Sequence, residues 1–299
     1  MFQCKIILDN KSAHYNTESD ITGIFKCYSR HNISIRSIKV RLDCIEFVRW
    51  NTFKHFTKYD NYNIIYTAEV TVLSAKKGIK HSLFNEAAYP FKIFIPRDLP
   101  SSYIHKYGQV FYVVTGTVIP FIWNDFSNSF IVLVKSPVDC FARKQYCGER
   151  LFHKEQVFKQ TYCWPEGKLI MEAFLPRTAF LPGDVVDFKV IVKNESNYQV
   201  KNIKIHFNKV IKFRPPTLKS KCRKFSDTIL KLEKDGVRAY TERIYDLRLS
   251  FPEVIDIPNL MACTMMKLEF CLKIWCSMPL FIKNVKIDIN SEMGHYISR

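Results

Sequence analysis

Glycine is scarce in this sequence, with 9 glycines among 299 residues. Loops that cradle phosphate groups need glycines where the backbone approaches the ligand closely. The sequence contains neither a G-x-G-x-x-G nor a G-x-x-x-x-G-K-[ST] segment. A nucleotide-binding enzyme is therefore not indicated, and we expect no cofactor.

Long apolar segments are also missing. The first residues, Met1 to Asp9, lack the apolar run of a signal peptide, and no stretch approaches the ~20 apolar residues of a membrane span. A chain that stays out of the secretory route keeps its thiols reduced. We therefore expect a cytoplasmic protein, with its 10 cysteines as small buried residues on strands rather than disulfides.

Motifs for metal binding and catalysis are absent as well. There is no C-x-x-C pair and no Cys/His cluster of the kind that holds zinc, so we expect no metal site. There is no G-x-S-x-G or H-E-x-x-H segment, and the eight histidines are scattered. A catalytic set built from distant segments is recognised only by geometry and stays open. We predict that the protein is not an enzyme.

Acidic residues are outnumbered, with 45 Lys plus Arg against 28 Asp plus Glu and a formal net charge of +17. Residues 1–165 carry 22 basic and 13 acidic residues (+9), and residues 166–299 carry 23 and 15 (+8). A nucleic-acid-binding or anionic-lipid-binding module is therefore the alternative function to consider. Single-strand platforms need exposed aromatics on one sheet face. Most aromatics here fall on strand positions that a core would use, so we do not expect nucleic acid.

One local basic run could bind an anion such as a phosphorylated tail or a lipid headgroup, with each charge contributing about 1 kcal/mol near an anionic membrane. The alternative is a solvated, solubilising loop. The run consists of Lys209, Lys212, Arg214, Lys219, Lys221, Arg223 and Lys224.

Alternation of apolar and polar residues dominates the chain and predicts an all-β fold. The expected strands include residues 33–42, 65–72, 110–118, 130–134, 168–175 and 185–192. Two short segments, Arg143 to Phe158 and Ser226 to Lys234, are the candidates for helices. Prolines 90, 96 and 100 bracket Phe91 to Ile95 and favour an edge strand there.

An internal repeat indicates two domains of one design. At an offset of 165, Tyr15 to Leu42 aligns with Phe180 to Phe207 without a gap, and apolar residues match throughout. The alternative is chance alignment of two amphipathic hairpins. The repeat predicts two tandem immunoglobulin-like antiparallel β-sandwich domains, at residues 1–165 and 166–299. Their boundary is expected near Thr161 to Gly167, where Pro165 and Gly167 interrupt the pattern.

The first half resembles the amino-terminal domain of the arrestin family, and in particular of the alpha-arrestins. Tyr15-Asn-Thr-Glu-Ser-Asp-Ile-Thr-Gly23 is similar to the family's Tyr-x-Pro-Gly-Glu-x-Val-x-Gly pattern, with Thr17 and Glu18 replacing Pro and Gly. From Leu83 onward, an aromatic strand ends at Pro96 and leads to a Leu99-Pro-Ser-Ser102 turn. A glycine and a tyrosine-bearing strand follow, as in the family.

The second half resembles the family's carboxyl-terminal domain. Ala179-Phe-Leu-Pro-Gly-Asp-Val185 and Lys193-Asn-Glu-Ser196 are similar to its Pro-Gly-Glu start and its Asn-x-Ser turn. The segments Ile257 to Leu260, Leu268 to Leu272 and Val285 to Gly294 look like its last strands.

The resemblance implies a non-enzymatic cytoplasmic adaptor that binds membrane cargo or sorting machinery in protein transport, endocytosis and endosomal sorting. It implies a cytoplasmic location, or a peripheral one at the plasma membrane or endosomes. Alpha-arrestins recruit ubiquitin ligases through Pro-Pro-x-Tyr motifs in a carboxyl tail. Here the only Pro-Pro pair continues as Pro215-Pro-Thr-Leu218, so this recruitment is not expected and we predict an arrestin type without that tail. Sheet edges and concave sheet faces are the expected docking surfaces.

Overall fold

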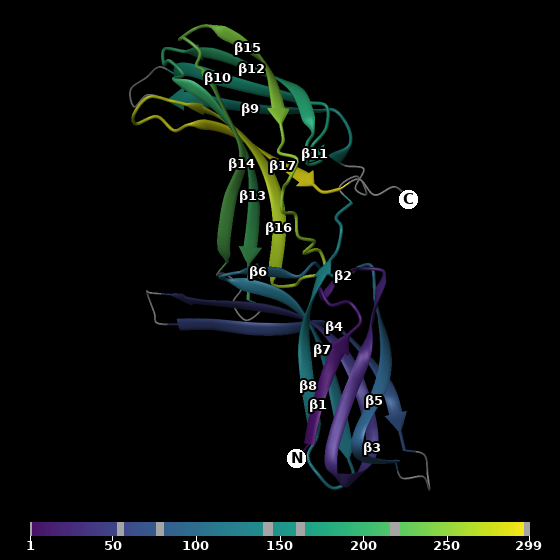
Figure 1. Ribbon diagram of the computed structural model, residues 1–299. Coiled ribbons are helices and arrows are strands. Elements are labelled where there is room, and N and C mark those ends of the chain that lie inside the picture. Colours follow the sequence, from purple (N-terminus) through teal and green to yellow (C-terminus); the bar gives the residue numbers. More distant parts are fainter. Residues whose placement is uncertain are drawn as a thin grey trace. The chain divides into compact units, whose positions relative to one another are not determined.

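The computed structural model describes residues 2–52, 57–75, 81–139, 146–159, 165–215 and 222–295. The chain forms two compact units, which are described separately below (Figure 1). Unit 1 comprises Met1–Ser136, Phe213–Arg223 and Pro258–Lys267, and unit 2 comprises Pro137–Lys212, Lys224–Ile257 and Leu268–Arg299. Two segments from late in the sequence therefore belong to unit 1. The domain limits at residues 165 and 166 stay a prediction.

Unit 1 is built from eight strands that form one continuous hydrogen-bonded sheet. The strands are β1 (Phe2–Leu8), β2 (His14–Asn16), β3 (Ser19–Thr52), β4 (Thr57–Ser74), β5 (His81–Ile95), β6 (Tyr103–His105), β7 (Gly108–Pro120) and β8 (Phe126–Lys135).

Strand β3 joins the two layers of this sandwich because it is 34 residues long. Its first part pairs with β1 and β5, and its second part pairs with β4 and β7. Irregularities in register between Ser29 and Ile33 bend the strand between these layers. The inward residues of both parts, such as Phe25 and Leu42, are fully buried.

Unit 2 contains two sheets. The first has the order β15-β12-β10-β9, and the second has the order β11-β17-β16-β13-β14. The strands are β9 (Arg150–Lys159), β10 (Pro165–Leu175), β11 (Ala179–Phe180), β12 (Val185–Ser196), β13 (Asn202–Phe213), β14 (Arg223–Asp235), β15 (Glu242–Ser250), β16 (Met266–Ser277) and β17 (Val285–Met293). The core between them includes Phe180, Phe207 and Phe251, whose ring centroids lie 4.9–5.4 Å apart.

The repeat found in the sequence is confirmed by the burial of its residues. Matched pairs such as Ile21 and Val186, or Leu42 and Phe207, are buried in their own units. The topology repeats too. The short strand β2 pairs in parallel with β8, the last strand of the first sandwich, and β11 pairs in parallel with β17, the last strand of the second. The all-β, tandem-sandwich prediction is therefore correct.

Both predicted helices are wrong. The described part of residues 143–158 is mostly strand β9, and residues 226–234 lie within strand β14; residues 143–145 are outside the described part. Strand β9 pairs along its length with β10, and β14 is the neighbour of β13. Backbone pairing with an adjacent strand overrides the weak helical pattern of such short segments.

The prolines behave partly as expected. Strand β5 has β3 as its pairing partner among the described strands, which fits an edge position, but the strand continues through Pro90, opposite Ile24. The Pro165 to Gly167 segment does not end the pattern before the next strand. It begins strand β10 with a register shift, and Gly167 has a φ of 100°, which favours glycine.

The eight cysteines in the described part of the chain are free thiols. Cys27, Cys44 and Cys276 are buried on strands as expected, whereas Cys147 and Cys222 are exposed. Within the described residues, no group of three or more His, Cys, Asp or Glu side chains could hold a metal ion. The same part of the chain has no helix long and apolar enough to cross a bilayer.

Candidate docking surface

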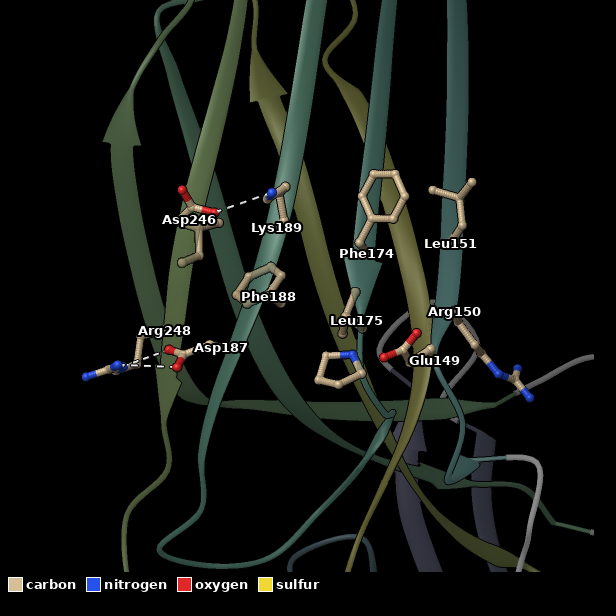
Figure 2. Close-up of a pocket in the computed structure, with 12 residues that line it drawn as sticks. Glu149, Arg150, Leu151, Phe174, Leu175, Asp187, Phe188, Lys189, Asp246 and Arg248 are labelled. Atoms are coloured by element: carbon tan, nitrogen blue, oxygen red, sulfur yellow. Dashed lines mark hydrogen bonds and ion pairs between the residues drawn. The ribbon is translucent and has the colours of Figure 1, made fainter.

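The outward face of the first sheet of unit 2 carries a groove of about 940 Å³ (Figure 2). Strands β9, β10, β12 and β15 all contribute to it. Because side chains alternate along a strand, every second residue of each strand points to this face. Pairing register then sets which of them become neighbours.

The apolar part of the groove lies on β9 and β10. Phe174 is paired with Leu151 on one side and with Lys189 on the other, and Lys189 is paired with Asp246. These four residues form one row across the sheet. Leu151 and Phe174 are both exposed, so two large apolar side chains meet on a surface that faces solvent. A contiguous exposed apolar patch with a polar border is typical of an interaction site.

The charged part of the groove lies on β12 and β15. Arg248 donates to both carboxylate oxygens of Asp187, at 2.7 and 3.2 Å, and Lys189 Nζ lies 4.0 Å from Asp246 (Figure 2). The hydrogen bond from Arg248 lowers the pKa of Asp187, and the same contact raises the pKa of Arg248. Such exposed pairs add little stability, so they are available to orient a charged partner.

Several side chains of the basic run predicted as an anion site already contact other groups of the protein. Lys209 donates to the backbone oxygen and the carboxylate of Asp256, at 2.6 and 3.0 Å, and Lys212 forms an ion pair with Glu269. The guanidinium of Arg223 lies over the ring of Tyr107, 5.7 Å from its centroid. Arg214 and Lys224 are exposed, and Lys219 and Lys221 lie outside the described residues. Anion binding by this run stays a prediction.

Unit 1 contains a buried carboxylate that the sequence analysis missed. Glu46 is fully buried and accepts four hydrogen bonds: from the backbone N–H groups of Thr264, Met265 and Met266 and from the Thr264 hydroxyl, at 2.8–3.0 Å. A buried charge is tolerated when such donors surround it. Glu46 thus fixes the Pro258–Lys267 segment to the rest of unit 1. The sequence pattern could have identified Glu46 as a buried carboxylate, because strand alternation places it on the same inward face as Leu42 and Cys44.

A second polar cluster holds the same segment. The backbone N–H of Ser101 donates to the backbone oxygen of Asn259 at 2.8 Å. The side-chain amide of Asn259 donates to the Ser136 hydroxyl at 2.9 Å. The Ser101 hydroxyl donates to the Ser136 backbone oxygen at 3.0 Å. Ser101 belongs to the Leu-Pro-Ser-Ser turn, so that motif has a structural role.

Similarity to known proteins covers both halves of the chain. Residues 4–136 match the family model described as "Arrestin (or S-antigen), N-terminal domain", and residues 165–296 match "Arrestin (or S-antigen), C-terminal domain". No curated protein matches the chain. The first match ends at Ser136, the last residue of the main segment of unit 1, and the second begins at Pro165, the first residue of β10.

Proposed function

The chain belongs to the arrestin family, and from that premise we propose that it is a non-enzymatic adaptor that binds extended peptide segments of membrane cargo or of sorting proteins. Proteins of this family are generally adaptors. The observation that carries the proposal is the groove of unit 2, where Leu151 and Phe174 form an apolar patch beside the charged pairs of β12 and β15.

The groove favours an extended peptide with an apolar anchor. An open sheet face with one apolar row can take one or two side chains of a strand-like segment, and the flanking charges then select its orientation. The charges that line the groove are balanced, with Arg150, Lys189 and Arg248 against Glu149, Asp187 and Asp246. Affinity should therefore come mainly from the apolar anchor and depend weakly on salt.

The finer assignment follows the motif resemblance. We infer an alpha-arrestin type that acts in endocytosis and endosomal sorting, in the cytoplasm or at the cytoplasmic side of the plasma membrane or endosomes. Ligase recruitment through Pro-Pro-x-Tyr is left out of the proposal, because the Pro-Pro pair of this sequence is followed by Thr217 and Leu218.

The experiment is a display screen of cytoplasmic tail peptides of membrane proteins against the full chain, followed by affinity measurements. Selected peptides should bind at least tenfold more weakly to the Leu151→Ser/Phe174→Ser variant, because truncated anchor contacts at hot spots cost about 2 kcal/mol or more. Val185→Ser is the matched control, since Val185 is an exposed apolar residue of β12 outside the groove.

The control should bind within about twofold of the unchanged protein. Equal binding of the best peptides to the double variant would show that the groove is not the docking site. Failure of the screen to enrich any tail peptide would contradict the adaptor proposal itself.

A further inference from the structure

The hairpin between β7 and β8 in unit 1 exposes three consecutive large apolar residues. Their exposed fractions are 42% for Phe121, 87% for Ile122 and 67% for Trp123. Single exposed apolar side chains are normal on soluble proteins, but a contiguous group is typical of an interaction site. This tip, defined as Phe121–Trp123, is far from the groove residues in sequence and belongs to the other unit.

The residues on both sides of the tip are held by contacts with neighbouring strands. The backbone N–H of Phe121 donates to the Ser34 oxygen at 3.1 Å, and Pro120 is paired with Ile35. On the other side of the turn, the ring of Phe126 stacks on Phe2, with centroids 4.1 Å apart. The fold therefore presents Ile122 and Trp123 to solvent on a fixed support.

A cation borders the tip. The Arg36 guanidinium lies over the Phe121 ring, 5.4 Å from its centroid. Within the described part of the chain, Arg36 forms no ion pair. The carboxylate of the loop, Asp125, faces a separate polar pocket that Lys39 and Arg41 also line. The tip is thus an apolar centre with the Arg36 cation at its edge.

This chemistry fits a lipid surface. Tryptophan favours the interface between headgroups and acyl chains, because its ring is apolar and its N–H can still find an acceptor. Isoleucine gains by leaving water, and arginines near the surface are attracted to anionic headgroups. We propose that the Phe121–Trp123 tip inserts into the interface of membranes that contain anionic lipids, with Arg36 contacting the headgroups.

The test is co-sedimentation of the full chain with phosphatidylcholine vesicles, with and without phosphatidylserine. The unchanged protein should bind the vesicles that contain phosphatidylserine. The Ile122→Ser/Trp123→Ser variant should bind them roughly thirtyfold more weakly, because two large apolar side chains lose their transfer into the interface. Thermal melting of this variant should be unchanged, since both side chains are exposed in the folded protein.

A matched control is available at the other end of strand β7. Ile104 lies on β6, which pairs with the first residues of β7, and it is 74% exposed. Ile104→Ser makes the same chemical change on the same unit but outside the tip, so it should leave vesicle binding unchanged. Arg36→Gln should weaken binding to anionic vesicles about fivefold and leave binding to neutral vesicles unchanged.

Tryptophan emission gives a second, site-specific measurement. The difference between the emission of the unchanged protein and of Trp123→Phe should shift to shorter wavelength when anionic vesicles are added, because the ring leaves water. Three results would overturn the proposal: the unchanged protein fails to sediment with anionic vesicles, the double variant sediments as well as the unchanged protein, or the Trp123 emission does not shift. Peptide binding in the groove would be unaffected by any of these variants.

Discussion

Glu46 in unit 1 and Ile211 in unit 2 each lie four residues past the end of their copy of the repeat, Leu42 and Phe207, and both are buried. In unit 2 the position is filled by an ordinary core side chain. In unit 1 it is a carboxylate, and the Pro258–Lys267 segment supplies the donors that it needs. The two sandwiches therefore differ at this point, because unit 1 has a polar anchor where unit 2 has an apolar core side chain. The anchored segment comes from the second half of the sequence but packs with the first.

The largest effect should come from removing that anchor. Glu46→Ala leaves three backbone N–H groups and one hydroxyl without their acceptor, so we expect a loss of about 3 kcal/mol or more in the free energy of unfolding. Ile211→Val removes one methyl group and should cost about 1 kcal/mol. Denaturant unfolding measures both changes.

Hydrogen exchange would locate the effect of Glu46→Ala. The amides of Thr264, Met265 and Met266 should exchange much faster in this variant than in Ile211→Val. If Glu46→Ala lowered the free energy of unfolding by no more than Ile211→Val does, the polar anchor would not stabilise unit 1 as we propose.

A second pair of equivalent positions, Ser29 and Asn194, differs in a smaller way. Asn194 is buried, and its amide donates to the backbone oxygens of Tyr198 and Arg238, at 2.7 and 3.0 Å. The Ser29 hydroxyl donates to the His31 oxygen alone, at 2.7 Å. We expect Asn194→Ala to cost about 2–3 kcal/mol and Ser29→Ala about 1 kcal/mol, because more buried acceptors lose a partner in the first variant. Equal losses in denaturant unfolding would contradict this ranking.

A tyrosine hydroxyl closes a loop in each unit. The Tyr112 hydroxyl donates to the Pro100 oxygen at 2.5 Å, and the Tyr245 hydroxyl donates to the oxygens of Asp235 and Gly236, at 2.7 and 3.2 Å. Tyr112 is fully buried, and burial raises its pKa. Tyr112→Phe should cost about 1–2 kcal/mol, because no water replaces the lost donor, and Tyr245→Phe about 0.5–1 kcal/mol. Thermal melting measures both losses. A larger drop in melting temperature for Tyr245→Phe than for Tyr112→Phe would contradict this ranking.

The smallest effects concern the thiols. Burial raises the pKa of Cys44 and of Cys276 to about 12, from an ordinary value of 9.0. In the native protein, both should resist alkylation at pH 8, whereas the exposed Cys147 and Cys222 should react. Mass spectrometry after brief iodoacetamide treatment measures the extent of alkylation at each cysteine. Fast labelling of Cys44 in the folded protein would contradict its buried environment.

The same thiols give stability a pH dependence with a definite sign. Because their pKa is higher in the folded than in the unfolded chain, the unfolded chain releases these protons first. Their contribution to stability is complete below about pH 9 and is lost as the pH rises towards about 12. Cys44→Ser should reduce this loss at high pH.

The strands and the duplication could be predicted because both depend on local patterns. The alternation in residues 110–118 and 185–192 is carried by the sequence itself, and strands β7 and β12 follow it. Strands β9 and β14 could not be predicted in the same way, because their residues alternate weakly and a neighbouring strand determines their backbone. The groove was missed because its apolar residues, Leu151 and Phe174, are 23 positions apart and become neighbours only through strand pairing.

The sequence by itself determined the all-β class, the two repeated sandwiches and their family, since side-chain alternation and motif order are properties of the chain. Only the tertiary structure decided which apolar residues remained exposed. Trp50 and Trp123 both follow strand-like runs, yet the first is buried and the second stands on a hairpin tip. The physical reason is that burial depends on what packs against a residue, and for Glu46 those neighbours, Thr264 to Met266, come from a distant position in the chain.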